Sequence, residues 1–524
     1  MHYSLGLLII ALMCTPIIAQ PESTDGSSVP ASGPGITPLD GGAAWTHYGG
    51  NARHQSRASG GITSPSLVTP AWIGSGDGTT TYIPIPQSGL VVDFKQVYTL
   101  AGNPAQPGAA FAIAYDRITG CFLWSTPVPP TILDSWSTPA IDIEHKQLIV
   151  ATGQTITAID ENTGVPNWST DIGAIVVNSS PIVTTDLGNQ DRLFVTNYSF
   201  GGGSSAVLTC INVDPFDSTQ NPFEPGEIVW QTQLNGQSSG NTPAYSAGTV
   251  YVATASSPGS NAGRILAFDA TADTAPSPIW TFTNTINAGF FSGVSIARGH
   301  VYASSFNFSG LQLNSNTVKV NKQTGQLVWS VPTNRTDATP IPLSNGDVVV
   351  SGGIAIGAFD FLPFFGSLPS IEYIADAGSS ATLLWDSALD TLDDTNSNGI
   401  WDFGETFLSI GGWTHQPISF TIGSTPMLLV GTLAETNPGV LFGHNTDIQL
   451  VDLTKAPTES GFLTEHYNGA GATPAIVGSW IYTSGAGGVY AFAPQSPPVT
   501  PTEILNLYLD GRITFEQLFE HLRR

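Results

Sequence analysis

The fold is decided by the stretch Ala114-Tyr115-Asp116-Arg117-Ile118-Thr119-Gly120-Cys121-Phe122-Leu123-Trp124, which returns as Ala158-Ile159-Asp160-Glu161-Asn162-Thr163-Gly164-Val165-Pro166-Asn167-Trp168. The tryptophans that end the two copies are 44 residues apart. A repeat of this length is typical of β-propeller blades, each of which is a four-stranded antiparallel sheet. One such sheet cannot bury both of its faces alone, so it has to pack against neighbouring copies.

Looser copies of the repeat follow, each opened by a small residue and proline, as at Thr242-Pro243, and closed by an aromatic residue. The seven closing residues are Trp124, Trp168, Trp230, Trp280, Trp329, Trp385 and Tyr467. An eighth unit opens at Thr473-Pro474 but has no closing tryptophan, whereas the strand around Trp72 near the N-terminus has no repeat of its own. We therefore predict that the Trp72 strand is the outer strand of the last blade, where it removes an open edge of the ring.

These repeats resemble those of the pyrroloquinoline quinone (PQQ)-like β-propeller proteins, which usually have eight blades. The resemblance rests on the two Ala-x-Asp-x-x-Thr-Gly-x-x-x-Trp copies and on the segment from Trp45 to His54, and it covers roughly residues 41–494. It implies that each repeat tryptophan packs between adjacent blades and has an architectural role. We expect His47 and His54 to belong to the packing of that first segment.

The sequence thus predicts an all-β, eight-bladed β-propeller of four-stranded antiparallel blades, closed by an N-terminal strand and followed by a short helical C-terminal tail. Residues 1–19 are typical of a signal peptide, and residues 20–40 form a flexible linker rich in Pro, Ser and Gly. The propeller is expected over residues 41–494, a Pro-rich linker over 495–502 and a helical tail over 503–524. The tail either docks on the propeller, binds a partner or is disordered.

Composition restricts the location and the partners of the chain. It carries 15 basic and 40 acidic residues, a net charge of −25, which disfavours nucleic acid and anionic membranes as partners. Beyond the signal peptide no segment is long and apolar enough to span a bilayer. We expect a monomer that is secreted, periplasmic or on the cell surface; Cys14 leaves a lipid anchor open, although the bulky Met13 before it argues against one.

One loop is predicted to bind a metal ion, and it lies within an insertion expected near residues 386–412. It reads Asp394-Thr395-Asn396-Ser397-Asn398-Gly399-Ile400-Trp401-Asp402-Phe403-Gly404-Glu405. Oxygen ligands at loop positions 1, 3, 5, 9 and 12, a glycine at 6 and a backbone carbonyl at 7 match the calcium loop of an EF-hand. The predicted ligands are Asp394, Asn396, Asn398, Ile400 through its carbonyl, Asp402 and Glu405. The alternative is an Asx-rich turn capped by its own side chains.

Catalytic motifs are weak by comparison. Some relatives implied by the resemblance are PQQ-dependent alcohol or sugar dehydrogenases, which typically carry an adjacent Cys-Cys pair, and this chain has no neighbouring cysteines. Gly236-Gln237-Ser238-Ser239-Gly240 satisfies Gly-x-Ser-x-Gly, but it falls where a propeller needs an ordinary loop. The histidines have no paired zinc-ligand spacing.

The sequence therefore favours a non-catalytic, exported propeller scaffold that binds a protein or glycan partner and has a structural calcium ion. A PQQ-dependent dehydrogenase, with PQQ as its cofactor, and a scaffold of the outer-membrane β-barrel assembly type remain as alternatives. Four glycosylation sequons begin at Asn178, Asn197, Asn307 and Asn334.

Overall fold

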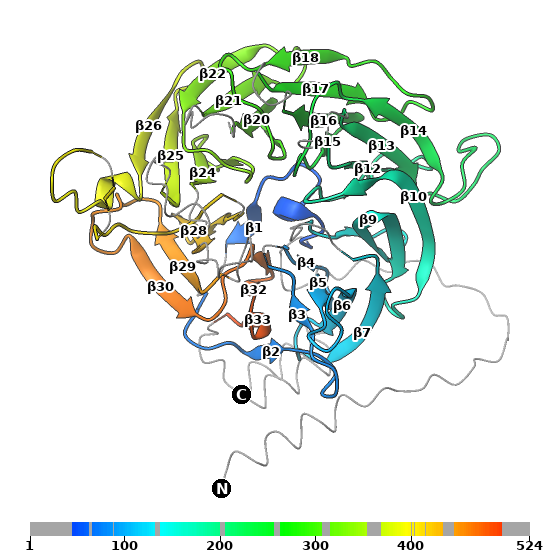
Figure 1. Cartoon of the computed structure of the whole chain (residues 1–524), viewed down its shortest axis with the longest axis horizontal. Helices are drawn as coiled ribbons and strands as arrows, with labels where there is room; N and C mark the ends of the chain where they lie inside the picture. The colour runs from blue at the N-terminus through cyan, green and yellow to red at the C-terminus, as the bar shows by residue number, and fades with distance from the viewer. Residues whose placement is uncertain are drawn as a thin grey trace, which may run out of the picture. The chain divides into compact units, whose positions relative to one another are not determined.

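The computed structural model describes residues 44–61, 65–86, 88–130, 137–199, 205–255, 262–306, 315–353, 368–399, 401–402, 404–413, 415–432 and 445–494. All of them lie in one compact unit, Gly42–Gln495. Within this unit eight sheets follow one another around a ring (Figure 1). The predicted eight-bladed propeller is therefore confirmed, and we number the blades in chain order.

The first four blades follow directly along the chain. Blade 1 contains β3 (Ile83–Pro84), β4 (Val91–Val92), β5 (Gln96–Gly102), β6 (Ala110–Asp116) and β7 (Phe122–Val128). Blade 2 contains β8 (Ala140–Asp142), β9 (Gln147–Asp160) and β10 (Pro166–Val176). Blade 3 contains β11 (Ile182–Val183), β12 (Arg192–Thr196), β13 (Val207–Asn212) and β14 (Ile228–Gln233). Blade 4 contains β15 (Ala244–Ser246), β16 (Thr249–Thr254), β17 (Arg264–Asp269) and β18 (Trp280–Thr283).

The other four blades include two strands from the N-terminal part of the chain. Blade 5 contains β19 (Ser295–Ala297), β20 (His300–Ser304), β21 (Asn316–Asn321) and β22 (Leu327–Pro332). Blade 6 contains β23 (Ile341–Pro342), β24 (Val348–Gly352), β25 (Ser370–Asp376) and β26 (Ala381–Asp386). Blade 7 contains β1 (Arg57–Gly61), β27 (Ile418–Ile422), β28 (Thr425–Gly431), β29 (Asp447–Asp452) and β30 (Leu463–Asn468). Blade 8 contains β31 (Ala475–Val477), β32 (Trp480–Gly485), β33 (Gly488–Phe492) and β2 (Trp72–Gly74).

Three blades depart from the predicted four strands. Blade 1 has five, because β3 and β4 both pair with β5. In blade 2 the start of β9 pairs with β8 and its later part, from Gly153 on, pairs with β10, so one 14-residue strand takes two strand positions. Gly153 has a φ of 58°, which allows the chain to change direction there. Blade 7 has five because β1 adds to it in parallel.

The ring is closed as the sequence predicts. Strand β2 pairs antiparallel with β33, and Trp72 lies opposite Ala491. The N–H of Ala71 also donates to the carbonyl of Ala491 at 2.7 Å. The last blade therefore takes its outer strand from the N-terminal side of the chain, and β33 has no open edge.

The repeat tryptophans pack on the glycines of the next blade, as the resemblance implies. Gly120 has a φ of 70°, and a Cβ added there would lie 2.6 Å from Cδ2 of Trp72. The same relation recurs between Gly164 and Trp124, where the distance would be 2.8 Å. The Asp-x-x-Thr-Gly turn thus needs glycine both for its backbone conformation and for the space that the indole occupies.

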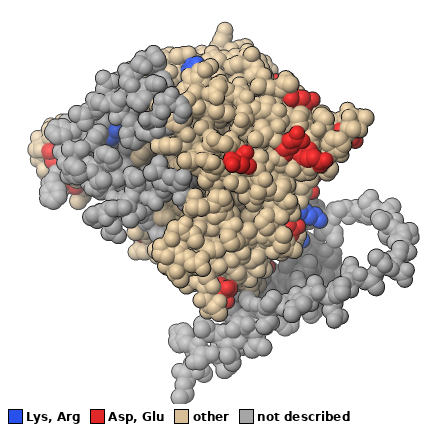
Figure 2. Space-filling model, turned by 45° about the vertical axis from the view of Figure 1, so that its right-hand side comes forward, with Lys and Arg blue, Asp and Glu red and all other residues tan. Residues whose placement is uncertain are grey.

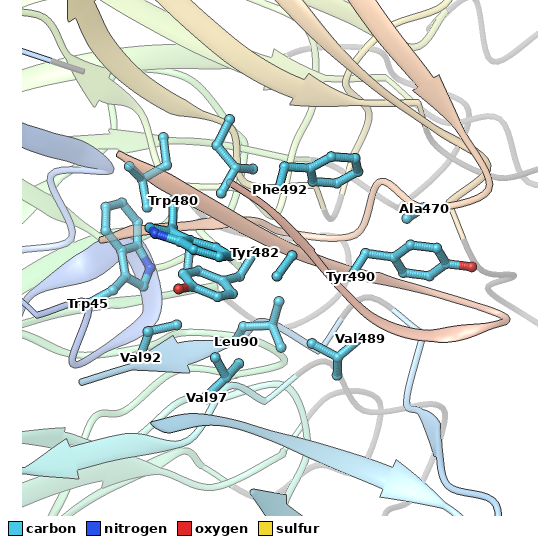
Figure 3. Packing of buried hydrophobic residues seen from close by; sticks show 14 of the residues in the cluster. Trp45, Leu90, Val92, Val97, Ala470, Trp480, Tyr482, Val489, Tyr490 and Phe492 are labelled. Carbon is cyan, nitrogen blue, oxygen red and sulfur yellow. The ribbon is translucent and has the colours of Figure 1, made fainter. Parts of the chain in front are cut away.

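A continuous apolar core joins blade 8 to blade 1 (Figure 3). Trp45, Val92, Val97, Trp480 and Tyr482 are all buried in it. The rings of Trp480 and Tyr482 stack with their centroids 6.2 Å apart. The core is therefore shared by strands from both ends of the propeller sequence.

Helices are scarce in the described part of the chain, where the 3-10 turns η1 (Tyr48–Gly50) and η3 (Leu389–Thr391) are found. No helix there has the length and apolar character needed to cross a membrane. The expected signal peptide, both linkers and the helical tail lie outside the described residues. Cys210 is buried with a free thiol.

Candidate functional site

The predicted calcium loop connects blade 6 to blade 7, after η3 and before β27. Five of its six predicted ligands fall on described residues: Asp394, Asn396, Asn398, Asp402 and Glu405. Ile400 lies outside the described residues.

Asp394 organises the first half of this loop. Its Oδ2 accepts a hydrogen bond from the backbone N–H of Gly399 at 2.7 Å, and its Oδ1 accepts one from Asn398 N–H at 3.1 Å. These bonds, with that from Gly399 first, hold the pKa of the Asp394 carboxyl below its usual value. Gly399 has a φ of 74°, so the sixth loop position requires the left-handed conformation for which glycine was predicted.

Asp402 and Glu405 fold the second half of the loop back onto the first. Asp402 Oδ2 accepts hydrogen bonds from the side-chain amides of Asn396 at 2.5 Å and Asn398 at 2.8 Å. The two oxygens of Glu405 accept one bond each from the backbone N–H groups of Thr395 at 2.8 Å and Asp402 at 2.9 Å. Hydrogen bonds to Asp402 and Glu405 therefore tie the second half of the loop to the first.

The loop has oxygens of the type that bind calcium, but these oxygens do not converge on one point. Asp394, Asp402 and Glu405 do not form a group whose carboxylate oxygens all lie within 4.8 Å of one another. Asn396 and Asn398 donate to Asp402, so their amide groups would have to turn for their oxygens to bind a cation. The described geometry is compatible with both the calcium loop and the Asx-rich turn.

A second feature, which the sequence indicates only in part, lies at the centre of the ring. Residues 44–57, here called the axial segment, run through the middle of the propeller beside the inner strands of the blades (Figure 1). The carbonyl of Thr46 accepts the N–H of Ile141 in blade 2 at 2.7 Å. The carbonyl of Ala52 accepts the N–H of Tyr245 in blade 4, also at 2.7 Å.

The same pattern continues around the ring. Trp45 exchanges two backbone hydrogen bonds with Val92 of blade 1, and the carbonyl of Arg53 accepts the N–H of Ile296 in blade 5 at 2.9 Å. The carbonyl of Ser56 accepts the N–H of Ser419 in blade 7 at 2.8 Å. The axial segment therefore satisfies backbone groups of inner strands far apart in the sequence, an arrangement that local sequence patterns cannot reveal.

Buried side chains complete the axial packing. Nε2 of His47 accepts the N–H of Val183 in blade 3 at 3.0 Å, and Nδ1 of His54 lies 3.1 Å from the carbonyl of Val294. Burial lowers the pKa of His47 to about 4 and that of His54 to about 3. Both imidazoles are therefore neutral at pH 7. The prediction that these histidines serve packing is confirmed.

One glutamine joins the axial segment to blades 6 and 7. Oε1 of Gln416 accepts the hydroxyl of Tyr48 at 2.7 Å and the N–H of Thr339 at 2.8 Å. Its amide nitrogen donates to Oγ of Ser56 at 2.8 Å. Asp337, two residues before Thr339, is also buried, and burial raises its pKa to about 7.

The Gly-x-Ser-x-Gly stretch is part of an ordinary connection. It lies between β14 and β15, and Ser238 is buried. The backbone N–H of Ser238 donates to Oγ of Ser199 at 2.9 Å. The surrounding strands lack the strand-turn-helix context of a nucleophile elbow, so the interpretation as a loop is confirmed.

The acidic composition is visible at the surface. Figure 2 shows Asp and Glu side chains over the described part of one face and few Lys or Arg side chains beside them. Of the four sequons, the side chains of Asn178 and Asn197 are buried, and Asn307 lies outside the described residues.

Comparisons with known proteins agree with the fold. The family model described as outer membrane protein assembly factor BamB matches residues 221–397. No curated protein sequence matches the chain.

Solved structures with this fold come from several classes of protein. The quinohemoprotein alcohol dehydrogenase from Pseudomonas putida HK5 is similar with 11% identity and a TM-score of 0.55, over 85% of this chain and 76% of that one. The quinohemoprotein alcohol dehydrogenase from Comamonas testosteroni has 12% identity and a TM-score of 0.53, over 88% and 84%. BamB from Moraxella catarrhalis has 15% identity and a TM-score of 0.47, over 81% and 96%.

The repeats and the ring therefore define the class of this protein as an eight-bladed β-propeller with PQQ-like repeats. The resemblance drawn from the Asp-x-x-Thr-Gly turns and their tryptophans is confirmed. At these identities the solved structures establish the fold alone.

Proposed function

We propose that this propeller is an exported, non-catalytic scaffold that binds a protein or glycan partner on its loops. The observation that carries the proposal is the axial segment. A propeller enzyme that uses its axis needs room there for cofactor and substrate, whereas here residues 44–57 lie in the middle of the ring. Trp45, His47, Tyr48 and His54 of this segment are all buried.

The chemistry of these groups supports the same proposal. His47 and His54 are neutral, and each has a ring nitrogen against a backbone group of an inner strand. Gln416 uses its side-chain oxygen and nitrogen to join Tyr48, Thr339 and Ser56. The polar atoms that make these bonds are directed at the protein itself and stabilise the ring. Nε2 of His54 is buried without a hydrogen-bond partner among the described residues.

A more specific candidate function is a scaffold of the outer-membrane assembly type. The family model for an outer membrane assembly factor matches residues 221–397, which span the last strand of blade 3 and all of blades 4, 5 and 6. This match favours a role in holding other envelope proteins over a role in catalysis. The competing proposal, a PQQ-dependent dehydrogenase, is supported by the fold that this chain shares with quinohemoprotein alcohol dehydrogenases.

Calcium has a structural role in this proposal. The loop from Asp394 to Glu405 joins blades 6 and 7, and a bound ion would fix its carboxylates in place of the present hydrogen bonds. The flanking described segments are the three-residue 3-10 turn η3 and an irregular stretch, without the long helices that a calcium switch moves. A calcium ion here would therefore stiffen the connection between the two blades.

The test combines cofactor binding with partner capture. Mature protein is titrated with PQQ, with calcium and with both, and is assayed for dye-linked oxidation of alcohols and sugars. We expect calcium to raise the melting temperature, PQQ to have no effect and no oxidation to occur. A PQQ-dependent shift with turnover would replace the scaffold by the dehydrogenase.

Partner binding is tested in cells of the native source. Photo-crosslinking residues are placed at Val165 and Ile279, which are 60% and 57% exposed in different blades. A discrete adduct formed from one of the two positions supports a scaffold with a defined binding face. Failure of crosslinkers placed across all described exposed loops would contradict it.

A further inference from the structure

A cluster of nitrogen and oxygen donors lies between blades 2 and 3. Glu144 and His145 belong to the turn between β8 and β9, and Asp214 follows β13. One ligand atom from each of these residues lies within 4.8 Å of the other two. Within the described ranges, no second trio of His, Cys, Asp or Glu side chains meets this distance.

A hydrogen bond at Nδ1 fixes the orientation of the His145 imidazole. Its Nδ1 lies 2.8 Å from Oδ2 of Asp142, a carboxylate that is only 1% exposed. The same oxygen accepts the side-chain amide of Gln147 at 2.9 Å, which fixes the carboxylate. Histidines that bind metals almost always donate their second ring nitrogen in this way. Asp142 is outside the donor trio and is the supporting residue that such a site needs.

The other ring nitrogen is directed at the neighbouring blade. Nε2 of His145 lies 3.0 Å from Oδ1 of Asp214. Oδ2 of Asp214 accepts the N–H of Asp191 at 2.6 Å, so this carboxylate is also fixed by its surroundings. Asp214 is buried and Glu144 is exposed, which gives the cluster a buried base and an opening to solvent.

The charge of the cluster favours a cation. Glu144, Asp214 and the supporting Asp142 place three carboxylates around one imidazole. One imidazole can carry at most a single positive charge, so the charge of these carboxylates is only partly compensated. A divalent ion would compensate that charge more fully than the single proton on Nε2.

We propose that Glu144, His145 and Asp214 bind a divalent transition-metal ion, best matched by Zn²⁺, which ties blade 2 to blade 3. One imidazole nitrogen and two carboxylate oxygens suit this class of ion, and water completes the fourth position. On binding, the proton on Nε2 of His145 leaves to solvent and the metal replaces the hydrogen bond to Asp214. The site is independent of the calcium loop and of the proposed scaffold function.

The experiment measures Zn²⁺ binding to the full mature chain, produced without a histidine tag and stripped with chelator. Calorimetry is expected to give one site per chain that is lost in His145→Gln. Glu144→Gln changes an exposed side chain and should fold normally, and we expect at least tenfold weaker binding. Asp142→Asn should weaken binding by about 10- to 100-fold, the range for residues that orient metal ligands.

Two controls keep the proposal falsifiable. His466→Gln removes an exposed histidine on β30, far from the cluster in sequence, and should leave binding unchanged. Substitution with Co²⁺ should give the visible absorption of a tetrahedral site in the wild type and in His466→Gln only. Absence of Zn²⁺ binding, or equal binding by wild type and His145→Gln, would show that the cluster is only an ionic contact between blades.

Discussion

The indole of Trp72 donates a hydrogen bond from Nε1 to the carbonyl of Arg117 at 3.1 Å, although the Trp72 strand belongs to blade 8 and Arg117 to blade 1. The same tryptophan lies opposite Ala491 in the sheet. One residue therefore completes the last blade and docks that blade on the first.

Truncation of Trp72 should destabilise the protein more than a neighbouring truncation. Trp72→Ala removes a partly buried indole, and we expect a loss of about 2–4 kcal/mol of unfolding free energy. Ile73→Ala is the matched control, because Ile73 is on the same strand but 50% exposed, and it should cost less than about 1 kcal/mol. Urea denaturation measures both. Equal losses would show that the indole adds nothing to ring closure.

The glycine beneath this indole gives a second prediction. Gly120→Ala introduces a Cβ 2.6 Å from Trp72 at a φ of 70°, whereas Gly188→Ala does so at a φ of 67° with nothing within 4 Å. The control isolates the backbone penalty, which is of order 1 kcal/mol. We expect Gly120→Ala to be worse by a further 1–3 kcal/mol, roughly the cost of overpacking. Identical melting temperatures for the two variants would contradict blade docking through this contact.

Acid should weaken the axial packing. Burial lowers the pKa of His47 to about 4, below its unfolded value of 6.5, so its contribution to stability is present above pH 6.5 and is lost as the pH falls towards 4. Protonation at Nε2 would also break the bond from Val183. Asp337 has the opposite effect on the pH dependence of stability. Burial raises its pKa to about 7, so its protonation favours the folded state as the pH falls.

Comparison of variants separates these opposing groups. In His47→Gln the side-chain oxygen can still accept from Val183 but cannot titrate. We expect the free energy of unfolding to fall less between pH 7 and pH 4.5 in this variant than in the wild type. The same pH slope in both proteins would mean that His47 is not a neutral, buried group.

Calcium removal tests the loop between blades 6 and 7. Asp394→Ala with Glu405→Ala should abolish the calcium-dependent rise in melting temperature, which corresponds to about 2.7 kcal/mol at a calcium concentration 100 times Kd. Asp217→Ala is the control, since Asp217 accepts hydrogen bonds in an exposed turn of blade 3 without calcium-loop spacing. A calcium effect that persists in the double variant would place the ion elsewhere.

The sequence predicts the repeated parts of this fold well and the unique parts poorly. Trp72 could be assigned to the last blade because seven units had a closing aromatic residue and one lacked it. The addition of β1 to β27 has no such signal, since Arg57–Gly61 carries no hydrophobic alternation. The long β9 was also missed, because its turn at Gly153 differs from the longer connections in other blades.

The two candidate metal sites also differ in how far the sequence alone could predict them. The order Asp394, Asn396, Asn398, Asp402 and Glu405 is visible within twelve residues, so a local motif was enough to find the loop. The trio of Glu144, His145 and Asp214 joins a turn of one blade to a loop of the next, and no spacing in the sequence connects them. Such a cluster becomes visible only when neighbouring blades are placed side by side.

The axial segment has a consequence for how the chain reaches its native state. Tyr48 bonds to Gln416, which lies 368 positions later, and the other inner-strand partners of this segment are spread along the intervening chain. During synthesis the segment emerges first, but its binding partners are complete only when nearly the whole propeller has been made. Structures dominated by such distant pairings fold slowly. We therefore expect the nascent chain to stay open until its last blade appears, a delay that would suit the exported role proposed above.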